Sequence, residues 1–483
     1  MRLVVHGGVV VSPSGLLRTD LVAEDGVIVA WVAAGDRWSS DTEVIDATGL
    51  LVFPGFIDPH VHSRDPGLTE KEDFVHSTGA AAAGGVTTIL EMPNAIPPVT
   101  DSVVLESRKR AHSAVAYVDF GLWALSLGAA NLSDLGGMLE AGAVGVKLFW
   151  GYAFEPTSGR LVFNWDAGDA RKLLLPPREG EVLEVMRTVA RYGSVLAAHC
   201  ENREVIEVSE RSLGHPIRSY DDLLAVRSEL AEASAVAMGV ELARATGARF
   251  HVLHASAART VTLVSRAQAD GIAVSAETCP HYLTLTDADY GKLGTTMKVY
   301  PPVRRSADQE ALWQGINCGT ICSVSSDHAP HTSEEKASNL AEAPAGGVGV
   351  ETLPSVLLNE MTLGRISAER LSWILAEGSA KLYGLYPRKG CLQPGSDADV
   401  TLVDPHAVRR VANSRLHSKV KVSAWDGAEL RGVPIMSILR GKVIMRGGEL
   451  VGERCGRFVA AERSADSAGP DLNRPWKVGD SIR

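Results

Sequence analysis

Cysteine, long apolar runs and basic clusters are all scarce in this sequence. Its 483 residues include six cysteines, scattered without close pairs, which argues against a disulfide framework. No stretch approaches the ~18 to 20 apolar residues of a membrane span. The amino terminus, "MRLVVHGGVVVSPSG", also lacks the longer apolar segment and cleavage site of a signal peptide. We therefore expect a cytoplasmic protein that does not contact a membrane.

The charge balance argues against binding to nucleic acid. The formal net charge is −10 and the pI is about 5.8, whereas phosphate binding requires a positive face. Hydrophobic residues make up 45% of the chain and the mean hydropathy is +0.03, as in ordinary globular enzymes. The composition therefore favours an enzyme that acts on a small molecule.

The chain is long enough for one large and one smaller domain. Short β-like runs broken by glycines fill residues 1–53 and return in residues 388–460, so we expect the two ends to form one composite β-sandwich domain. Between them, residues 54–387 alternate apolar strands with alanine-rich amphipathic segments. This rhythm predicts an α/β fold of the (β/α)8 TIM-barrel type. A doubly wound sheet is the alternative, but no glycine-rich dinucleotide loop follows the first strand. Residues 461–483 are polar and are expected to lie outside the core.

Metal-binding side chains follow several of the expected barrel strands. In "FPGFIDPHVHSRDPGLTEKEDF", residues 53–74, His60 and His62 are two apart, so on a strand both point to one face and could hold one ion. A lone histidine would be unremarkable there. Further candidates end later apolar runs, and they are His199, His254 and Asp327. Imidazole and carboxylate ligands suit zinc, with manganese, iron and cobalt as alternatives. Asp327 could also accept the proton of an attacking water.

Lys147, in "VGVKLFWGY", has two interpretations at this stage. An ammonium has no lone pair for a metal, so an ordinary lysine paired with an acid is the simpler one. A buried lysine also shifts toward the neutral amine, and a neutral amine can take up carbon dioxide to form a carbamate. The residue by itself does not decide between them.

Several motifs resemble the cyclic amidohydrolases, the group of dihydroorotases, hydantoinases or dihydropyrimidinases, and allantoinases. The most specific are "DPHVHSRDPGLTEKEDF", "AAAAGGVTTILEMPN", "ETCPHYL", "SSDHAPHTSEEK" and "GSDADVTLVD". The resemblance implies a metal-carrying barrel, a composite β domain and a homo-oligomer, a dimer or tetramer. It also implies that His60, His62 and Asp327 hold one divalent ion, zinc by default. His199 and His254 would then hold a second ion, and carboxylated Lys147 would bridge the two.

The implied reaction is hydrolysis of a ring amide, with Asp327 moving the proton to the leaving nitrogen. Arg64, Asn94 and His331 match positions with which dihydroorotases hold the substrate carboxylate, and an arginine fork suits a carboxylate. Dihydroorotase-like activity is therefore our first expectation.

Two departures favour a neutral ring instead. Tyr300, in "KVYPPVR", stands where dihydroorotases usually have asparagine, and Tyr152 resembles a hydantoinase tyrosine that donates to the oxyanion. We rank hydantoinase or dihydropyrimidinase second and allantoinase third. The long segment 155–180 is expected to cover the pocket. A non-catalytic scaffold is the alternative of a different class, although all six expected ligand positions are filled.

Overall fold

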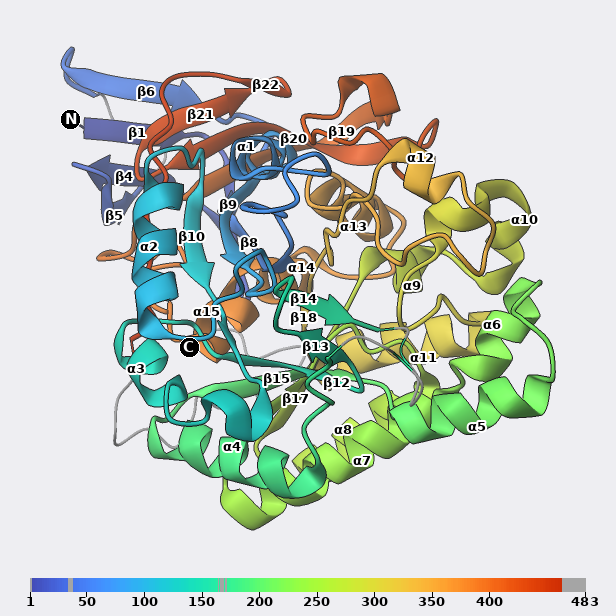
Figure 1. Ribbon diagram of the computed structural model, residues 1–483. Coiled ribbons are helices and arrows are strands. Elements are labelled where there is room, and N and C mark those ends of the chain that lie inside the picture. The colour runs from blue at the N-terminus through green and yellow to red at the C-terminus, as the bar shows by residue number, and fades with distance from the viewer. Residues whose placement is uncertain (1, 34–37, 164, 166–168, 170–171, 463–483) are drawn as a thin grey trace.

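The largest part of the molecule is a ring of parallel strands surrounded by helices (Figure 1). The computed structural model describes residues 2–33, 38–163, 165, 169 and 172–462. The ring is formed by β8 (Phe56–Val61), β9 (Val86–Glu91), the interrupted pair β10 (Asp119–Leu122) and β11 (Ala124–Leu125), β12 (Val146–Trp150), β15 (Val195–Cys200), β16 (Arg249–Val252), β17 (Val274–Thr278) and β18 (Ile321–Val324).

The ring closes between its first and last strands. The amide of His62 donates to the carbonyl of His328 at 2.8 Å, and Val61 pairs with His328 in a parallel bridge. The strands are short apolar runs buried on both faces, as expected for parallel strands covered by helices. The predicted (β/α)8 barrel is confirmed.

Helices cover the outside of the ring, and several begin at a residue whose side chain caps the first turn. Asp73 caps α1 by accepting from the amide of His76, and Gly85 ends that helix at a φ of 97°. The larger helices are α1 (Phe74–Gly84), α2 (Ser102–Ser113), α4 (Glu179–Arg191), α5 (Arg203–Leu213), α7 (Glu229–Thr246), α8 (Ala258–Ala269), α11 (Ser306–Cys318) and α13 (Leu353–Thr362). Shorter helices are α3 (Leu135–Glu140), α6 (Tyr220–Val226), α9 (Pro280–Thr284), α10 (Tyr290–Leu293), α12 (Ser333–Lys336), α14 (Ala368–Ser372) and α15 (Gly378–Leu382).

Strands from both ends of the chain share one sheet, in which β19 pairs with β7 and β7 with β2. In Figure 1 the blue amino-terminal and red carboxyl-terminal strands lie together at one end of the molecule. Its order is β22 (Glu449–Leu450), β21 (Lys442–Arg446), β20 (Glu429–Leu439), β19 (Val400–Arg410), β7 (Leu51–Pro54), β2 (Val9–Ser12) and β3 (Gly15–Arg18). A second sheet contains β5 (Val27–Val32), β4 (Asp20–Glu24), β1 (Arg2–His6) and β6 (Thr42–Asp46). Side chains of both sheets form one apolar core, so they pack as a sandwich.

A buried charge cluster, which we call the floor cluster, lies at the start of β10, where the barrel meets the terminal strands. The ammonium of Lys389 lies 2.5 Å from Asp119, 2.8 Å from Asp397 and 2.6 Å from Asp399. Arg440 also pairs with Asp119. Every carboxylate of the floor cluster therefore contacts a cation, which makes it a structural joint.

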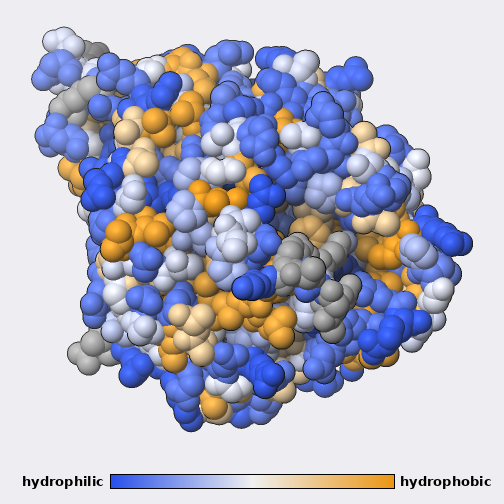
Figure 2. Space-filling view, in the orientation of Figure 1, coloured by the Kyte–Doolittle hydropathy of each residue, from blue (hydrophilic) through white to orange (hydrophobic). Residues whose placement is uncertain are grey.

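The last described residues of the chain pack against the barrel. Residues up to 462 run back along the barrel, where Val459 donates to the carbonyl of Phe120 at 2.8 Å. The predicted extension 461–483 lies almost wholly outside the described residues, and the predicted boundaries at 53, 388 and 460 stay predictions. In the described ranges, no helix is long and apolar enough to cross a membrane. The visible face in Figure 2 carries small hydrophobic groups scattered among hydrophilic residues.

Candidate active site

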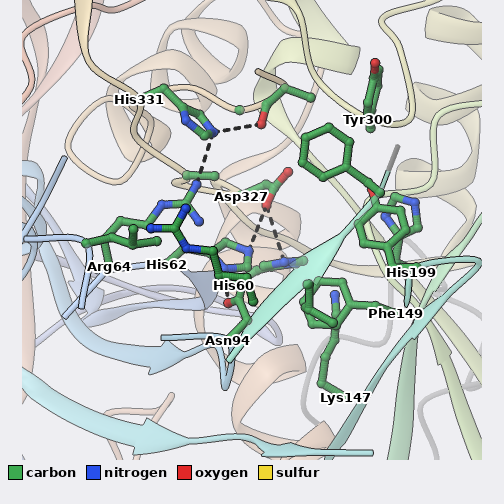
Figure 3. A pocket seen from close by; sticks show the side chains of 18 of the residues that line it. His60, His62, Arg64, Asn94, Lys147, Phe149, His199, Tyr300, Asp327 and His331 are labelled. Carbon is green, nitrogen blue, oxygen red and sulfur yellow. Dashed lines mark hydrogen bonds and ion pairs between the residues drawn. The ribbon is translucent and has the colours of Figure 1, made fainter. Parts of the chain in front are cut away.

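His60, His62 and Asp327 meet at the mouth of the barrel, where strands β8 and β18 end. One carboxylate oxygen of Asp327 lies 3.3 Å from Nε2 of His60 and 3.5 Å from Nε2 of His62. One ligand atom from each residue lies within 4.8 Å of the other two, close enough to hold one metal ion. Figure 3 shows the two imidazoles pointing at this carboxylate. The three residues that the sequence pattern predicted to lie together are therefore adjacent in the structure.

The backbone at the mouth is strained. Arg64, His254 and Asp327 have φ values of 59°, 38° and 46°, a region that residues other than glycine rarely adopt. Such conformations cost roughly 1–3 kcal/mol each and persist where the surroundings enforce them, often at functional sites. His62 and His254 also lie just beyond β8 and β16 rather than within them. A turn after the strand, and not strand alternation alone, therefore aims these side chains.

A second imidazole pair lies beside the first. Nδ1 of His199, on β15, is 3.1 Å from Nε2 of His254, and the other nitrogen of His199 contacts Glu201 at 2.9 Å. Glu201 is itself paired with Arg227 at 2.5 Å. Burial lowers the pKa of both histidines, so they are neutral at pH 7, which is the form that ligates metals. Glu201 is a supporting residue that sequence reasoning missed.

Lys147, on β12, is fully buried and faces the same space (Figure 3). Its Nζ has no hydrogen-bond partner among the described residues and lies 4.4 Å from the centre of the Phe149 ring. Burial lowers the pKa of Lys147 to about 8. The simple interpretation from the sequence, a lysine paired with an acid, is therefore wrong. An unpartnered amine among four imidazoles and a carboxylate matches the donor set of a metal site that needs one more anionic ligand.

Glu277, at the end of β17, supports the first imidazole pair. Its carboxylate lies 2.8 Å from Nδ1 of His60 and 3.4 Å from His251, and it accepts from Ser325 at 2.9 Å. Burial would raise the pKa of Glu277, but the hydrogen bonds from His251 and His60 outweigh it and lower the pKa to about 2. An ionised partner on Nδ1 orients the ring, so Nε2 faces the Asp327 carboxylate. The sequence analysis did not single out Glu277.

Asn94, expected to touch substrate, contacts a histidine in this structure. Its amide oxygen lies 2.7 Å from Nδ1 of His62, which it can orient as Glu277 orients His60. Asn94 also lines the cavity at the mouth, so its amide nitrogen stays available to a bound molecule. One residue can therefore serve both purposes.

The cavity has a volume of about 260 Å³ and two chemically different ends. One end presents Arg64, Lys71 and His331. The opposite wall is aromatic and is formed by Phe149, Tyr152, Phe163 and Tyr300. Figure 3 shows Arg64 and His331 on one side of the Asp327 carboxylate and Phe149 and Tyr300 on the other.

The predicted cover over the pocket is seen in part. Within segment 155–180, β13 (Ala153–Glu155) pairs with β14 (Arg160–Val162), and Arg160, Leu161 and Phe163 line the cavity. Residues 164, 166–168 and 170–171 of that segment lie outside the described ranges.

The two tyrosines are held firmly. The guanidinium of Arg227 lies 3.4 Å from the centre of the Tyr300 ring, and the Tyr152 ring lies 4.7 Å from that of His199. Burial raises the pKa of the Tyr152 phenol well above its usual value, so it is a donor at neutral pH.

A family model named amidohydrolase family matches residues 51–444. The chain belongs to the amidohydrolase family. An allantoinase from Rubrobacter xylanophilus is 37% identical over 95% of this chain and 98% of its own length. An L-hydantoinase from Paenarthrobacter aurescens is 34% identical over 93% and 96%, and a dihydroorotase from Pelotomaculum thermopropionicum is 34% identical over 92% and 99%.

Solved structures show the same fold. An L-hydantoinase from Arthrobacter aurescens superposes with a TM-score of 0.87 and 32% identity, covering 95% of this amidohydrolase and 99% of that chain. A dihydropyrimidinase from Brevibacillus agri gives 0.85 and 26%, covering 96% and 100%. The relatives are named as hydrolases of cyclic amides, so the expected family, fold and class of enzyme are confirmed. Their names denote different rings.

Proposed function

We propose that this amidohydrolase opens a cyclic amide that carries a carboxylate, as a dihydroorotase does. The observation that carries the proposal is the position of Arg64. Its guanidinium ends in the cavity, 3.4 Å from Nε2 of His331, at the side of the metal-competent cluster opposite the aromatic wall. A planar fork of donors in a buried site favours a carboxylate.

The ligand set suits two divalent ions, with zinc as the first candidate. His60, His62 and Asp327 would hold one, His199 and His254 the other, and carboxylated Lys147 would lie between them. Carboxylation adds carbon dioxide to the neutral amine of Lys147, forming a nitrogen–carbon bond and releasing one proton. When bound, such ions make water nucleophilic near neutral pH and polarise a carbonyl oxygen.

The chain's own residues account for the proton transfers. Burial would raise the pKa of Asp327, but His60, His62 and His254 outweigh it and hold the pKa well below the usual range. Asp327 is therefore ionised and can accept a proton from the attacking water. It then returns the proton to the ring nitrogen that leaves. The Tyr152 hydroxyl lines the cavity and would donate to the oxygen of the amide under attack.

A neutral ring is the second candidate, because the aromatic wall offers an apolar substituent a large contact area. Hydantoinase or dihydropyrimidinase activity would use it, and allantoinase activity is a third candidate, in keeping with the names of the relatives. The scaffold alternative predicts that purified protein binds no ions even after zinc and bicarbonate are supplied. We expect about two ions per chain.

The decisive experiment compares Arg64→Ala with Arg160→Ala. Both arginines line the cavity, but Arg160 lies on the exposed part of the hairpin. We expect Arg64→Ala to weaken transition-state binding of dihydroorotate by ~2 to 4 kcal/mol, as loss of a buried charged hydrogen bond does. Dihydrouracil, which lacks the carboxylate, should change little, and Arg160→Ala should affect both substrates weakly.

The measurement is kcat/KM for ring opening across dihydroorotate, dihydrouracil, substituted hydantoins, allantoin and cyclic imides. Opening of the uncharged rings alone would refute the carboxylate proposal and favour the second candidate. The cytoplasmic location and the homo-oligomeric assembly stay predictions.

A further inference from the structure

Lys71 lies behind His331 at the cationic end of the cavity. Its ammonium is 3.3 Å from Nδ1 of His331 and 2.6 Å from a carboxylate oxygen of Glu335. Its side chain is 14% exposed, so water competes little for these contacts. Neither Lys71 nor Glu335 was among the expected site residues.

The contact with Lys71 decides which nitrogen of His331 carries the proton. Nδ1 of His331 faces the Lys71 ammonium at 3.3 Å and the Glu335 carboxylate at 3.5 Å. The ammonium is nearer and can only donate, so Nδ1 accepts from it, and a neutral ring then carries its proton on Nε2. The ring is neutral because burial lowers the pKa of His331, as do the positive charges of Arg64, Lys71 and Lys336. In agreement, Nε2 lies 3.1 Å from the carbonyl of Ala345, to which it can donate.

This tautomer gives the cavity two donors side by side when a bound carboxylate shares the Nε2–H of His331 with the Ala345 carbonyl. The Nε2–H of His331 lies 3.4 Å from Nη2 of Arg64, a spacing that the two oxygens of one carboxylate could bridge. With the opposite tautomer, Nε2 would present a lone pair and repel a carboxylate. The protonated nitrogen of His331 therefore matters for binding an anion.

Other hydrogen bonds hold Lys71 and the segment around Ala345, whose carbonyl accepts from His331. Glu335 is fixed by a reciprocal pair, in which its amide donates to the Thr332 hydroxyl at 3.2 Å and its carboxylate accepts from the Thr332 amide at 3.0 Å. The ammonium of Lys336 donates to the carbonyls of Pro344 and Gly346 at 3.1 and 2.9 Å, on either side of Ala345. Both neighbours of the imidazole are thus held from outside the cavity.

We propose that Lys71 is a positioning residue that keeps the proton of His331 on Nε2, so that an anionic group of the substrate meets two adjacent donors. The inference rests on the proposed carboxylate substrate and deepens it. Lys71 need not touch the substrate, because it acts through the imidazole.

The kinetic test is a double-mutant cycle with Lys71→Met, His331→Ala and both changes together, in zinc-loaded protein. We expect Lys71→Met to raise KM for dihydroorotate about 10-fold, with kcat within about 2-fold and dihydrouracil unchanged. In the His331→Ala background, Lys71→Met should add nothing, because residues that act through one another are not additive. Lys71→Arg keeps a cationic donor and should restore most of the binding.

A second measurement does not depend on activity. Nitrogen-15 chemical shifts of histidine-labelled protein, with His331→Ala used for assignment, report which ring nitrogen is protonated. We expect only the Nε2–H form in the unchanged protein and a mixture of tautomers in Lys71→Met.

The outcomes separate the two proposals. Additive effects of Lys71→Met and His331→Ala, or an Nδ1–H form in the unchanged protein, would overturn the role of Lys71. An unchanged tautomer in Lys71→Met would do the same. If the unchanged protein opens no carboxylate ring, the proposed function fails, while the nitrogen-15 result still decides what Lys71 does.

Discussion

Two buried lysines at opposite ends of the barrel have opposite surroundings. At the mouth, Lys147 has no hydrogen-bond partner in the described part of the chain, and burial lowers its pKa to about 8. In the floor cluster, burial by itself would lower the pKa of Lys389, but the charges of Asp399, Asp119 and Asp397 outweigh burial and raise that pKa. The same side chain is therefore a potential reactive amine in one place and a permanent cation in the other.

The same contrast applies to the acids. Asp119, Asp397 and Asp399 lie as close together as His60, His62 and Asp327, so either group could hold a metal by distance alone. In the floor cluster the ammonium of Lys389 lies within 2.8 Å of all three carboxylates, whereas at the mouth the Nζ of Lys147 has no such partner among the described residues. Proximity of ligand atoms therefore identifies a metal site only when the chain has not neutralised them itself.

The largest expected effect comes from Lys147→Met. Because an anionic ligand between the ions would be lost, we expect kcat/KM to fall by at least about 10⁴-fold, roughly 5 kcal/mol. The midpoint of the metal-free protein should not fall and should rise at neutral pH, since a buried, unpaired ammonium is replaced by an apolar group of similar size. Activity and metal content by elemental analysis, measured beside the midpoint, check this. Full activity in Lys147→Met would break the contrast between mouth and floor.

Lys389→Met is the matched change in the floor cluster and should have the reverse profile. It leaves three buried carboxylates with too few cations, which costs about 3–5 kcal/mol of unfolding free energy. Metal content and kcat of the folded fraction should stay as they were. Denaturant unfolding followed by circular dichroism measures the loss. A variant as stable as the parent would mean that the floor cluster is not the joint described above.

The lowered pKa of Lys147 should also make the stability of the protein depend on pH. Below pH 8 Lys147 is protonated in both states, and between pH 8 and 10.5 the unfolded chain still holds a proton that the folded chain has released. Unfolding free energy of metal-free, carbon dioxide-free protein should therefore rise over this window, by about 3 kcal/mol relative to Lys147→Met. Parallel pH profiles of the two proteins would show that Lys147 is not perturbed.

The smallest expected effect comes from removing the carboxylate that orients His60. Glu277→Gln removes the charge that orients His60, and we expect zinc affinity to fall about 10 to 100-fold. Asp20→Asn is a matched control, because Asp20 contacts His6 at 2.8 Å in the terminal sheet, far from the mouth in the chain's fold. Competition with a chelator measures both. Equal losses in the two variants would indicate a general effect on folding.

Sequence reasoning was most successful where the signal is local. His60 and His62 are two residues apart, and each of the other expected ligands follows an apolar run, so a barrel brings them to one end. It was least successful where the partner is remote. Glu277 lies 217 residues from His60 in the chain, and Lys71 lies 260 from His331, so neither pairing has a spacing to reveal it. The contact of Asn94 with His62 was also missed, while its expected contact with substrate stays a prediction.

The sequence by itself determined the barrel, its family and the kinds of side chain at the mouth, because strand periodicity and motifs are properties of neighbouring residues. Only the tertiary structure decided which buried charge is paired and which is not. Lys147 and Lys389 are the same residue type, and although Lys147 follows an apolar run and Lys389 does not, neither neighbourhood reveals which lysine gains acidic partners. The difference arises because folding brings three acids into ion pairs with Lys389 and leaves Lys147 without such a partner among the described residues, and the energy of a buried charge depends on what surrounds it in space.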